Sequence, residues 1–215
     1  MEEKNPFTMY FTMFRELISE VLDLLVPPRP TERVVRLLTL DELHDLAQED
    51  GLPYHDPRVT ALIWELKYYG TRRARQLAGA YLAEVLMAVA AEELGKPLLI
   101  PIPMHQNRRR ERGHNQTELL CKAALSFTDP VGFEYAPTAL VRVVNTKTQQ
   151  GLPRQVRLRN VHGSMAAGPG AEKIKDRVCV VVDDVTTTGA TLQEAQRVLR
   201  LCGARAVHVT ALARS

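Results

Sequence analysis

The chain has 215 residues, 45% of them hydrophobic, and its 28 Lys and Arg against 25 Asp and Glu give a formal net charge of +3. This length and composition, with no low-complexity tract, predict one sizeable core with at most a small appendage. No apolar run approaches the roughly 18 residues of a membrane span, and the acidic start Met1-Glu2-Glu3 lacks the basic flank of a secretion signal. These features exclude a membrane-spanning protein and predict a cytoplasmic one.

The first expected element is an amphipathic helix from Phe7 to Val26, whose apolar residues recur at helical spacing. A proline-rich stretch at 27–30 ends it. Its polar face is acidic, at Glu16, Glu20 and Asp23, so a membrane surface is less favoured than packing against the domain or a second subunit. The sequence therefore leaves open whether the protein forms a homodimer.

Three further helices are expected before the first core strand. A short acidic helix is predicted from Asp41 to Gln48. The next begins at Asp56-Pro57, because Asp56 can cap the helix and proline suits its first position, and Gly70 is placed to end it. The last runs from Arg72 to Leu94.

The helix that begins at residue 57 carries several aromatic residues beside a lysine. Trp64 is expected in the core, since large aromatic side chains are usually well buried. For Lys67 and Tyr68 two placements stay open, either facing a ligand cleft or at the surface.

A short apolar strand, Leu98 to Ile102, leads into a strongly basic segment. The positive charge of the segment from Met104 to Gly113 attracts anions. Its candidate anion-binding residues are His105, Arg108, Arg110 and Arg112.

A second basic stretch, from Tyr135 through Ala171, contains no Asp or Glu. Such one-signed segments attract polyanions, although many are only solvated loops. Gly151-Leu152-Pro153 within it indicates an irregular, movable connection. Its basic residues are Arg142, Lys147, Arg154, Arg157 and Arg159.

The strand predicted from Arg177 to Val182 is β-branched and ends in Asp183 and Asp184. Ligands of open α/β sheets bind at the carboxyl ends of the strands, where two carboxylates suit the vicinal hydroxyls of a ribose. The turn that follows, Thr186-Thr187-Thr188-Gly189-Ala190-Thr191, has no side chain larger than threonine. A phosphate can therefore approach its backbone at a helix start. The segment predicts a sugar-phosphate site.

A helix is predicted directly after this turn, with Thr191 and Glu194 as a capping box and Gly203 as its stop. The last strand is expected from Ala206 to Leu212. Strands alternating with helices predict an α/β fold, with a mainly parallel sheet flanked by helices on both faces.

The three cysteines, Cys121, Cys179 and Cys202, lack the spacing of metal ligands. They are expected to be small buried apolar residues, and no protein metal site is predicted.

The segment 180–191 is similar to the diphosphoribosyl-binding signature of type I phosphoribosyltransferases. That resemblance implies the type I phosphoribosyltransferase fold and a phosphoribosyl pyrophosphate (PRPP) substrate. It also implies that Asp183 and Asp184 hold the ribose hydroxyls and that Thr186 to Thr191 hold the 5′-phosphate. By the same resemblance, Met104 to Gly113 would be the loop that contacts pyrophosphate, and Thr146 to Arg159 would be the mobile loop that closes over the site.

Two further motifs resemble the ComF family of competence-associated phosphoribosyltransferase homologues. The first is the segment 103–118, which departs from the family pattern at four positions. The second is Thr146-Lys147-Thr148-Gln149-Gln150-Gly151-Leu152, continued at Arg154, Arg157, Asn160 and Gly163. Many ComF-like chains begin with a four-cysteine zinc module, but the first hundred residues here contain no cysteine, so zinc is not expected.

The resemblance extends from about Tyr54, which divides the chain into a helical N-terminal appendage (1–53) and a phosphoribosyltransferase-like domain (54–215). It implies a transferase that releases pyrophosphate and is linked to DNA uptake in natural competence. Asp183, Asp184, Arg154 and Arg157 would be the catalytic residues, with Mg²⁺ bound mainly through PRPP. The alternatives are a non-catalytic PRPP-binding protein and a single-stranded DNA-binding accessory protein of transformation, with single-stranded DNA or competence proteins as partners. The acceptor carries no recognisable motif.

Overall fold

The computed structural model describes residues 27–128, 132–144 and 161–215. Within these residues, five strands form a parallel sheet in the order β1-β7-β6-β2-β3, and two form a separate antiparallel pair. The strands are β1 (Leu52–Pro53), β2 (Leu98–Pro101), β3 (Glu134–Tyr135), β4 (Leu140–Arg142), β5 (Met165–Ala167), β6 (Val178–Thr186) and β7 (Ala206–Arg214). The predicted helix from Phe7 to Val26 lies outside the described residues.

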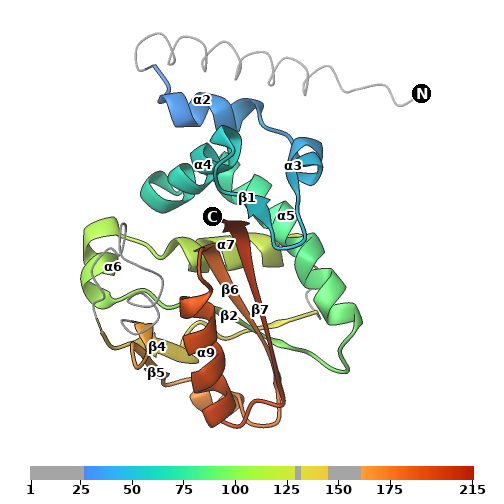
Figure 1. The fold of residues 1–215 in the computed structure, drawn as a ribbon, viewed down its shortest axis with the longest axis vertical. Helices are drawn as coiled ribbons and strands as arrows, with labels where there is room; N and C mark the ends of the chain where they lie inside the picture. Colours follow the sequence, from blue (N-terminus) through green and yellow to red (C-terminus); the bar gives the residue numbers. More distant parts are fainter. Residues whose placement is uncertain (1–26, 129–131, 145–160) are drawn as a thin grey trace, which may run out of the picture.

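Helices lie on both faces of this sheet (Figure 1), which confirms the predicted architecture. The α-helices are α2 (Pro30–Leu37), α3 (Leu40–Leu46), α4 (Pro57–Trp64), α5 (Arg72–Ala91), α6 (Gln106–Arg112), α7 (Gln116–Leu125) and α9 (Ala190–Leu201). A π-helix, η1 (Glu65–Tyr69), continues α4, and a short 3-10 helix, η2 (Ala171–Lys173), precedes β6.

The central strands are buried on both faces because alternate residues pack into two different clusters. Leu99, Val180 and Val182 join α5 and α7 on one face. The intervening residues Ile100 and Val181 pack against α9 on the other. A strand covered on both sides reads as a continuous apolar run, which is why these strands could be predicted from the sequence.

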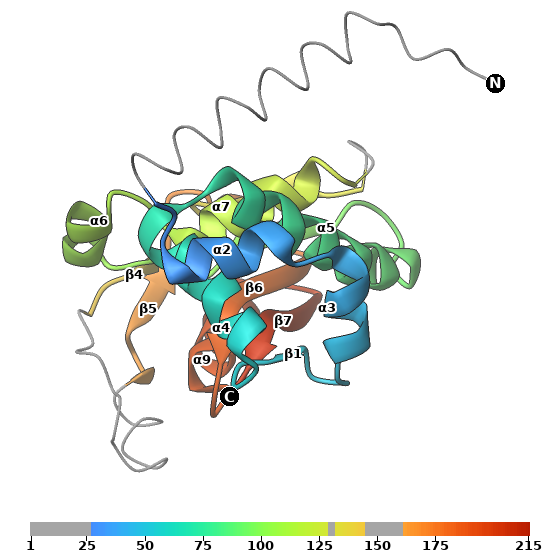
Figure 2. The same ribbon diagram turned by 90° about the horizontal axis from the view of Figure 1, so that it is seen from above.

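Helices α2, α3 and α4, together with β1 and η1, lie over the carboxyl ends of β6 and β7 (Figures 1 and 2). We call residues 30–69 the hood. Its side chains Val35, Leu43 and Leu52 belong to the same hydrophobic cluster as Leu212 of the sheet. The hood and the sheet therefore share one core.

Strand β6 is longer than predicted, because it stays paired with β7 as far as Thr186 opposite Arg214. Its other neighbour, β2, stops earlier, with Pro101 opposite Val182. Beyond Val182 one edge of β6 is consequently open, and Asp183 and Asp184 lie along that open edge.

Two sequence predictions about caps and loops are wrong. Helix α9 starts at Ala190, after Gly189 with φ of 76°, so Thr191 lies inside the helix and forms no capping box. Glu194 instead accepts a hydrogen bond from the Gly163 amide at 2.8 Å and pairs with Arg197. The basic segment after β2 is largely helical rather than a loop, because the His105 ring caps α6 by accepting the Asn107 amide hydrogen.

Candidate functional site

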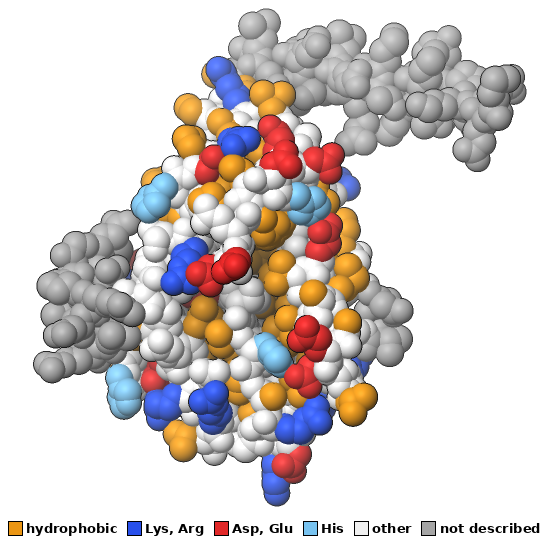
Figure 3. Space-filling model, turned by 45° about the vertical axis from the view of Figure 1, so that its right-hand side comes forward, with side chains coloured by type: hydrophobic (Ala, Val, Ile, Leu, Met, Phe, Trp, Pro, Cys, Tyr) orange, Lys and Arg blue, Asp and Glu red, His pale blue; other side chains and the backbone are white. Residues whose placement is uncertain are grey.

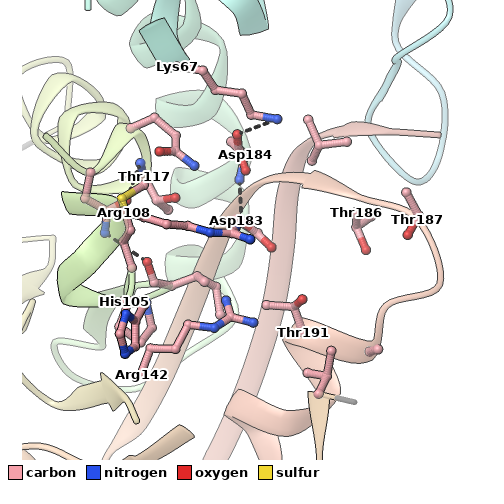
Figure 4. A pocket seen from close by; sticks show the side chains of 18 of the residues that line it. Lys67, His105, Arg108, Thr117, Arg142, Asp183, Asp184, Thr186, Thr187 and Thr191 are labelled. Atoms are coloured by element: carbon pink, nitrogen blue, oxygen red, sulfur yellow. Dashed lines mark hydrogen bonds and ion pairs between the residues drawn. The ribbon is translucent and has the colours of Figure 1, made fainter. Parts of the chain in front are cut away.

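A cavity of about 390 Å³ lies where the carboxyl ends of β2 and β6 meet the hood. Figure 4 shows lysine, aspartate, arginine and threonine side chains directed toward it from several elements. Its polar lining consists mainly of Lys67, His105, Arg108, Arg112, Arg142, Asp183, Asp184 and the turn from Thr186 to Thr191. The structure thus brings together most of the residues that were singled out in the sequence.

Asp183 and Asp184 are nearly buried, with 8% and 5% of their surface exposed. The Asp184 amide donates a hydrogen bond to Asp183 Oδ1 at 2.9 Å. Burial raises the pKa of Asp183 well above its usual value, and the negative charge of Asp184 raises it further. In the absence of a ligand, Asp183 therefore tends to hold a proton.

Lys67 provides the counter-charge for the second carboxylate, with its Nζ 3.1 Å from Asp184 Oδ2 (Figure 4). Burial alone would lower the pKa of Lys67, but the charge of Asp184 and their hydrogen bond outweigh it, so the pKa is raised. Lys67 therefore stays protonated and pairs with Asp184. The open question about Lys67 is thus answered, since it faces the cavity.

The π-helix η1 determines where Lys67 points. Its i→i+5 pattern is closed by the Gly70 amide, which donates to the carbonyl oxygen of Glu65 at 2.7 Å. Gly70 adopts a φ of 55°, which glycine tolerates best. The fully buried Glu65 carboxylate is held by Arg29 at 3.0 Å and by the hydroxyl of Thr31 at 2.6 Å. Single π-helical turns often occur at functional sites.

The turn after β6 has the geometry of an anion-binding site. Every residue from Thr186 to Thr191 lines the cavity, and Gly189 in the left-handed conformation leads directly into α9. The backbone N–H groups in the first turn of this twelve-residue helix have no partners within the helix, and its dipole favours negative charge there. A phosphate group at this turn would accept hydrogen bonds from these N–H groups and would be stabilised by the helix dipole.

Three of the four predicted anion-binding residues of the basic segment, His105, Arg108 and Arg112, line the cavity. Arg110 is exposed on α6 and is not part of the lining. The predicted catalytic residues Arg154 and Arg157 lie outside the described residues, so their roles stay predictions.

Arg142, on β4, was singled out in the sequence only as part of a basic window, yet it lines the cavity. Burial lowers the pKa of this arginine, repulsion from Arg108 acts in the same direction, and attraction to Asp183 opposes both. An arginine nevertheless remains protonated in proteins, so Arg108 and Arg142 bring two positive charges to the side of the cavity near Asp183.

The expectation that Trp64 lies in the core is wrong, because 45% of its surface is exposed and it lines the cavity. Tyr54 and Tyr68 line it as well. Residues 64, 67 and 68 share one helical face, and this spacing was the available signal that they act together. Cys121 and Cys179 are buried as expected, whereas Cys202 is only partly buried.

A second cavity, of about 500 Å³, lies behind the threonine-rich turn and shares Thr186 to Gly189 with the first. Figure 3 shows hydrophobic side chains gathered in a hollow on this side of the molecule. The second cavity is lined by residues of α5, α9 and β7, among them Leu82, Leu192 and Val209. The turn therefore has a cavity on each side.

Comparison with known proteins supports the resemblance seen in the sequence. Residues 125–215 match the family model described as "Phosphoribosyl transferase domain". The DNA utilization protein YhgH of Salmonella typhi is 33% identical over 165 residues, which cover 75% of this chain and 69% of that protein. Competence protein F of Haemophilus influenzae is 32% identical over 117 residues, or 54% of this chain and 50% of that protein.

Solved structures with a similar fold are more distant. A glutamine PRPP amidotransferase from B. subtilis, complexed with ADP and GMP, is 18% identical with a TM-score of 0.42, covering 70% of this chain and 30% of that one. The hypoxanthine phosphoribosyl transferase of Trypanosoma cruzi is 13% identical with a TM-score of 0.42, covering 64% of this chain and 73% of that one. Because these identities and TM-scores are low, the fold is assigned from the family model, the relatives of higher identity and the sheet topology.

The part of the chain that the structure describes has no helix long and apolar enough to span a bilayer. It also has no group of three or more His, Cys, Asp or Glu side chains able to hold a metal ion.

The parallel sheet, the acidic pair with its threonine-rich turn and the identity to YhgH agree with one another: the chain belongs to the ComF family of phosphoribosyltransferase-like proteins and has the type I phosphoribosyltransferase fold.

Proposed function

We propose that the protein binds PRPP in the cavity at the carboxyl ends of β2 and β6 and transfers its phosphoribosyl group to an acceptor, releasing pyrophosphate. The observation that carries this proposal is the union, in one cavity, of a buried carboxylate pair with an anion-binding turn and several cations. Such a site matches the ribose, the 5′-phosphate and the pyrophosphate of one molecule. This function agrees with the cytoplasmic location expected from the sequence.

In this proposal Asp183 and Asp184 accept hydrogen bonds from the two ribose hydroxyls, and the turn from Thr186 to Thr191 holds the 5′-phosphate. The carboxylates also stabilise the positive charge that develops on the ribose ring as pyrophosphate departs. Lys67 would give up part of its contact with Asp184 when a ribose hydroxyl takes its place. The ion pair is therefore a contact of the unliganded site that a bound ribose would partly replace.

Pyrophosphate is assigned to the cationic side of the cavity, at His105, Arg108 and Arg142. Arginine binds phosphate oxygens with two parallel N–H groups, which fixes the leaving group in line with the ribose. The expectations for Arg110, Arg154 and Arg157 stay part of the proposal. Arg110 would need to turn toward the cavity in order to take part.

Mg²⁺ fits this donor set, because two adjacent carboxylates offer hard oxygen atoms while no three-residue protein cage is present among the described residues. Asp183 and Asp184 would hold the ion directly or through water, and PRPP would supply the remaining ligands. When bound, the ion would offset the negative charge of the pyrophosphate.

The decisive test is titration calorimetry with PRPP and Mg²⁺. We expect the native chain to bind and the double variant Asp183→Asn, Asp184→Asn to bind at least about 100-fold more weakly, since two charge-assisted hydrogen bonds are lost. The exposed Asp45→Asn variant controls for the loss of a negative charge. Equal affinity in the double variant and the native chain would refute the site.

A second candidate function is binding of single-stranded nucleic acid, as suggested by the relatives named for DNA utilization and competence. The structural observation in its favour is the exposed Arg110 of α6, the helix whose Arg112 lies 5.2 Å from the ring centroid of the exposed Tyr68. Binding of that kind weakens steeply as salt increases, and it needs neither PRPP nor turnover. An oligonucleotide titration at two salt concentrations, with pyrophosphate release measured separately, distinguishes the two functions.

A further inference from the structure

The hood presents two large aromatic side chains to the cavity without burying them. Trp64 and Tyr68 are 45% and 47% exposed, and both line the cavity. Their ring centroids lie 4.6 Å apart with an interplanar angle of 39°. Aromatic side chains left half-exposed in a cavity provide a stacking surface for a flat ligand.

A cation stands beside this aromatic pair. Arg112, at the end of α6, has its Cζ 5.2 Å from the centroid of the Tyr68 ring and lines the same cavity. Among the described residues its guanidinium forms no ion pair with a carboxylate. Contact with a ring uses the face of the guanidinium and leaves N–H donors along its edge, where they can bind a carboxylate in two parallel hydrogen bonds.

Arg112 is distinct from the cations assigned to pyrophosphate. Arg108 and Arg142 influence each other electrostatically near Asp183, whereas Arg112 contacts the hood through Tyr68. Lys67, which lies on the same face of the hood as Trp64 and Tyr68, is already neutralised by Asp184. The hood side of the cavity thus combines a stacking surface with one positive charge that the described protein does not neutralise.

From this arrangement we propose that the acceptor is a planar aromatic molecule carrying a carboxylate, with its ring on Trp64 and Tyr68 and its carboxylate on Arg112. This inference rests on the proposed function and changes the expected role of Arg112 from pyrophosphate binding to acceptor binding. In the transfer step, a nitrogen lone pair of the acceptor forms the bond to ribose C1 while the C1–O bond to pyrophosphate breaks. Pyrophosphate leaves with the electron pair, and any proton on the attacking nitrogen passes to water.

The test uses Trp64, which is the only tryptophan of the chain, as a fluorescent reporter of binding. Ribose 5-phosphate, pyrophosphate and Mg²⁺ are first added to fill the other end of the cavity. Two matched pairs of probes are then titrated, pyridine-3-carboxylate against pyridine-3-carboxamide and orotate against uracil. We expect at least one carboxylate to quench the fluorescence with an affinity about tenfold or more above that of its neutral partner, after correction for absorption by the probe.

The variant Arg112→Gln should remove this preference while leaving the affinity for the neutral partner unchanged. Arg200→Gln, which removes an exposed charge from α9, should keep the preference. The proposal is overturned if carboxylate and neutral probes bind equally, if neither binds, or if the preference survives in Arg112→Gln. PRPP calorimetry without any acceptor tests the proposed PRPP binding separately. Failure of the acceptor proposal is therefore distinguishable from failure of the proposed function.

Discussion

At the scale of single residues, Asp183 is a carboxyl group at a position where burial and a neighbouring carboxylate both disfavour its charged form. A group whose pKa is raised on folding stabilises the protein below its unfolded pKa, and this stabilisation is lost as the pH rises through the folded pKa. We therefore expect Asp183→Asn to be more stable than the native chain at pH 8. The difference should grow as the pH rises from 4 to 8, because charging the buried carboxyl then costs the native chain stability.

Chemical denaturation at a series of pH values measures this difference. It should shrink toward zero near pH 4, where Asp183 is protonated and resembles asparagine. The amide oxygen of asparagine can still accept the hydrogen bond from the Asp184 amide, so the local fold is retained. Asp45→Asn serves as the exposed control, and a constant advantage of Asp183→Asn at all pH values would contradict the explanation.

The residues predicted to hold ribose and phosphate could be singled out from the sequence because they are local in the chain, and all of them line one cavity. Asp183, Asp184 and the turn after them form one continuous segment, so their order alone indicated a site. Lys67 and Trp64 could not be assigned in this way, because their roles depend on contacts with residues far along the chain, such as the Lys67–Asp184 ion pair. A tryptophan on a helix is usually buried, and only the hood geometry exposes this one.

At the scale of elements, α5 and α7 pack so closely that a glycine is required between them. A Cβ atom built on Gly79 would lie 2.6 Å from Ala123 Cβ and 2.8 Å from the Ala123 carbonyl carbon. Alanine is normally worth about 1 kcal/mol more than glycine inside a helix, but overpacking costs about 1–3 kcal/mol.

We expect Gly79→Ala to lower the free energy of unfolding by up to about 2 kcal/mol and the thermal midpoint by up to roughly 8 °C, because the clash outweighs the gain in helix propensity. Met87→Ala, at an exposed position of α5, is the control and should be nearly neutral. Scanning calorimetry of both variants provides the measurement. A stabilised Gly79→Ala protein would mean that the two helices move apart at little cost.

Element boundaries were predicted less accurately than element types. Strand β6 continues past the acidic pair because β7 offers backbone partners there, which no local pattern encodes. The same holds for α6, where a histidine ring provides the cap in place of the usual Ser, Thr, Asp or Asn. The α9 capping box was predicted from spacing alone, but Glu194 instead pairs with Arg197 and Gly163. The capping-box motif does not include the positions of these two partners.

At the scale of the whole molecule, the hood and the sheet share a hydrophobic cluster and should unfold together. Leu43, fully buried in α3, belongs to the same cluster as Leu212 of β7. Leu43→Ala should cost about 2–5 kcal/mol and shift the entire transition rather than detach the hood. Leu37→Ala, at an exposed hood position, should have little effect.

Coincident unfolding curves from Trp64 fluorescence and far-UV circular dichroism would establish this coupling. Separate transitions for the two signals, or a Leu43→Ala effect confined to the fluorescence, would show that the hood unfolds independently. Cooperative behaviour would also explain why Lys67, which the hood carries, can be held over a carboxylate of the sheet with the precision of an ion pair.

The threonine-rich turn has a cavity behind it as well as in front of it. Because the turn borders free volume on its far side, it can shift slightly to fit a ligand without disturbing the packed interior. We therefore expect side chains on the far side of the turn, such as Gln193 and Gln196, to influence how tightly a phosphate is held. Changes there offer a way to tune affinity while every atom that meets the ligand stays the same.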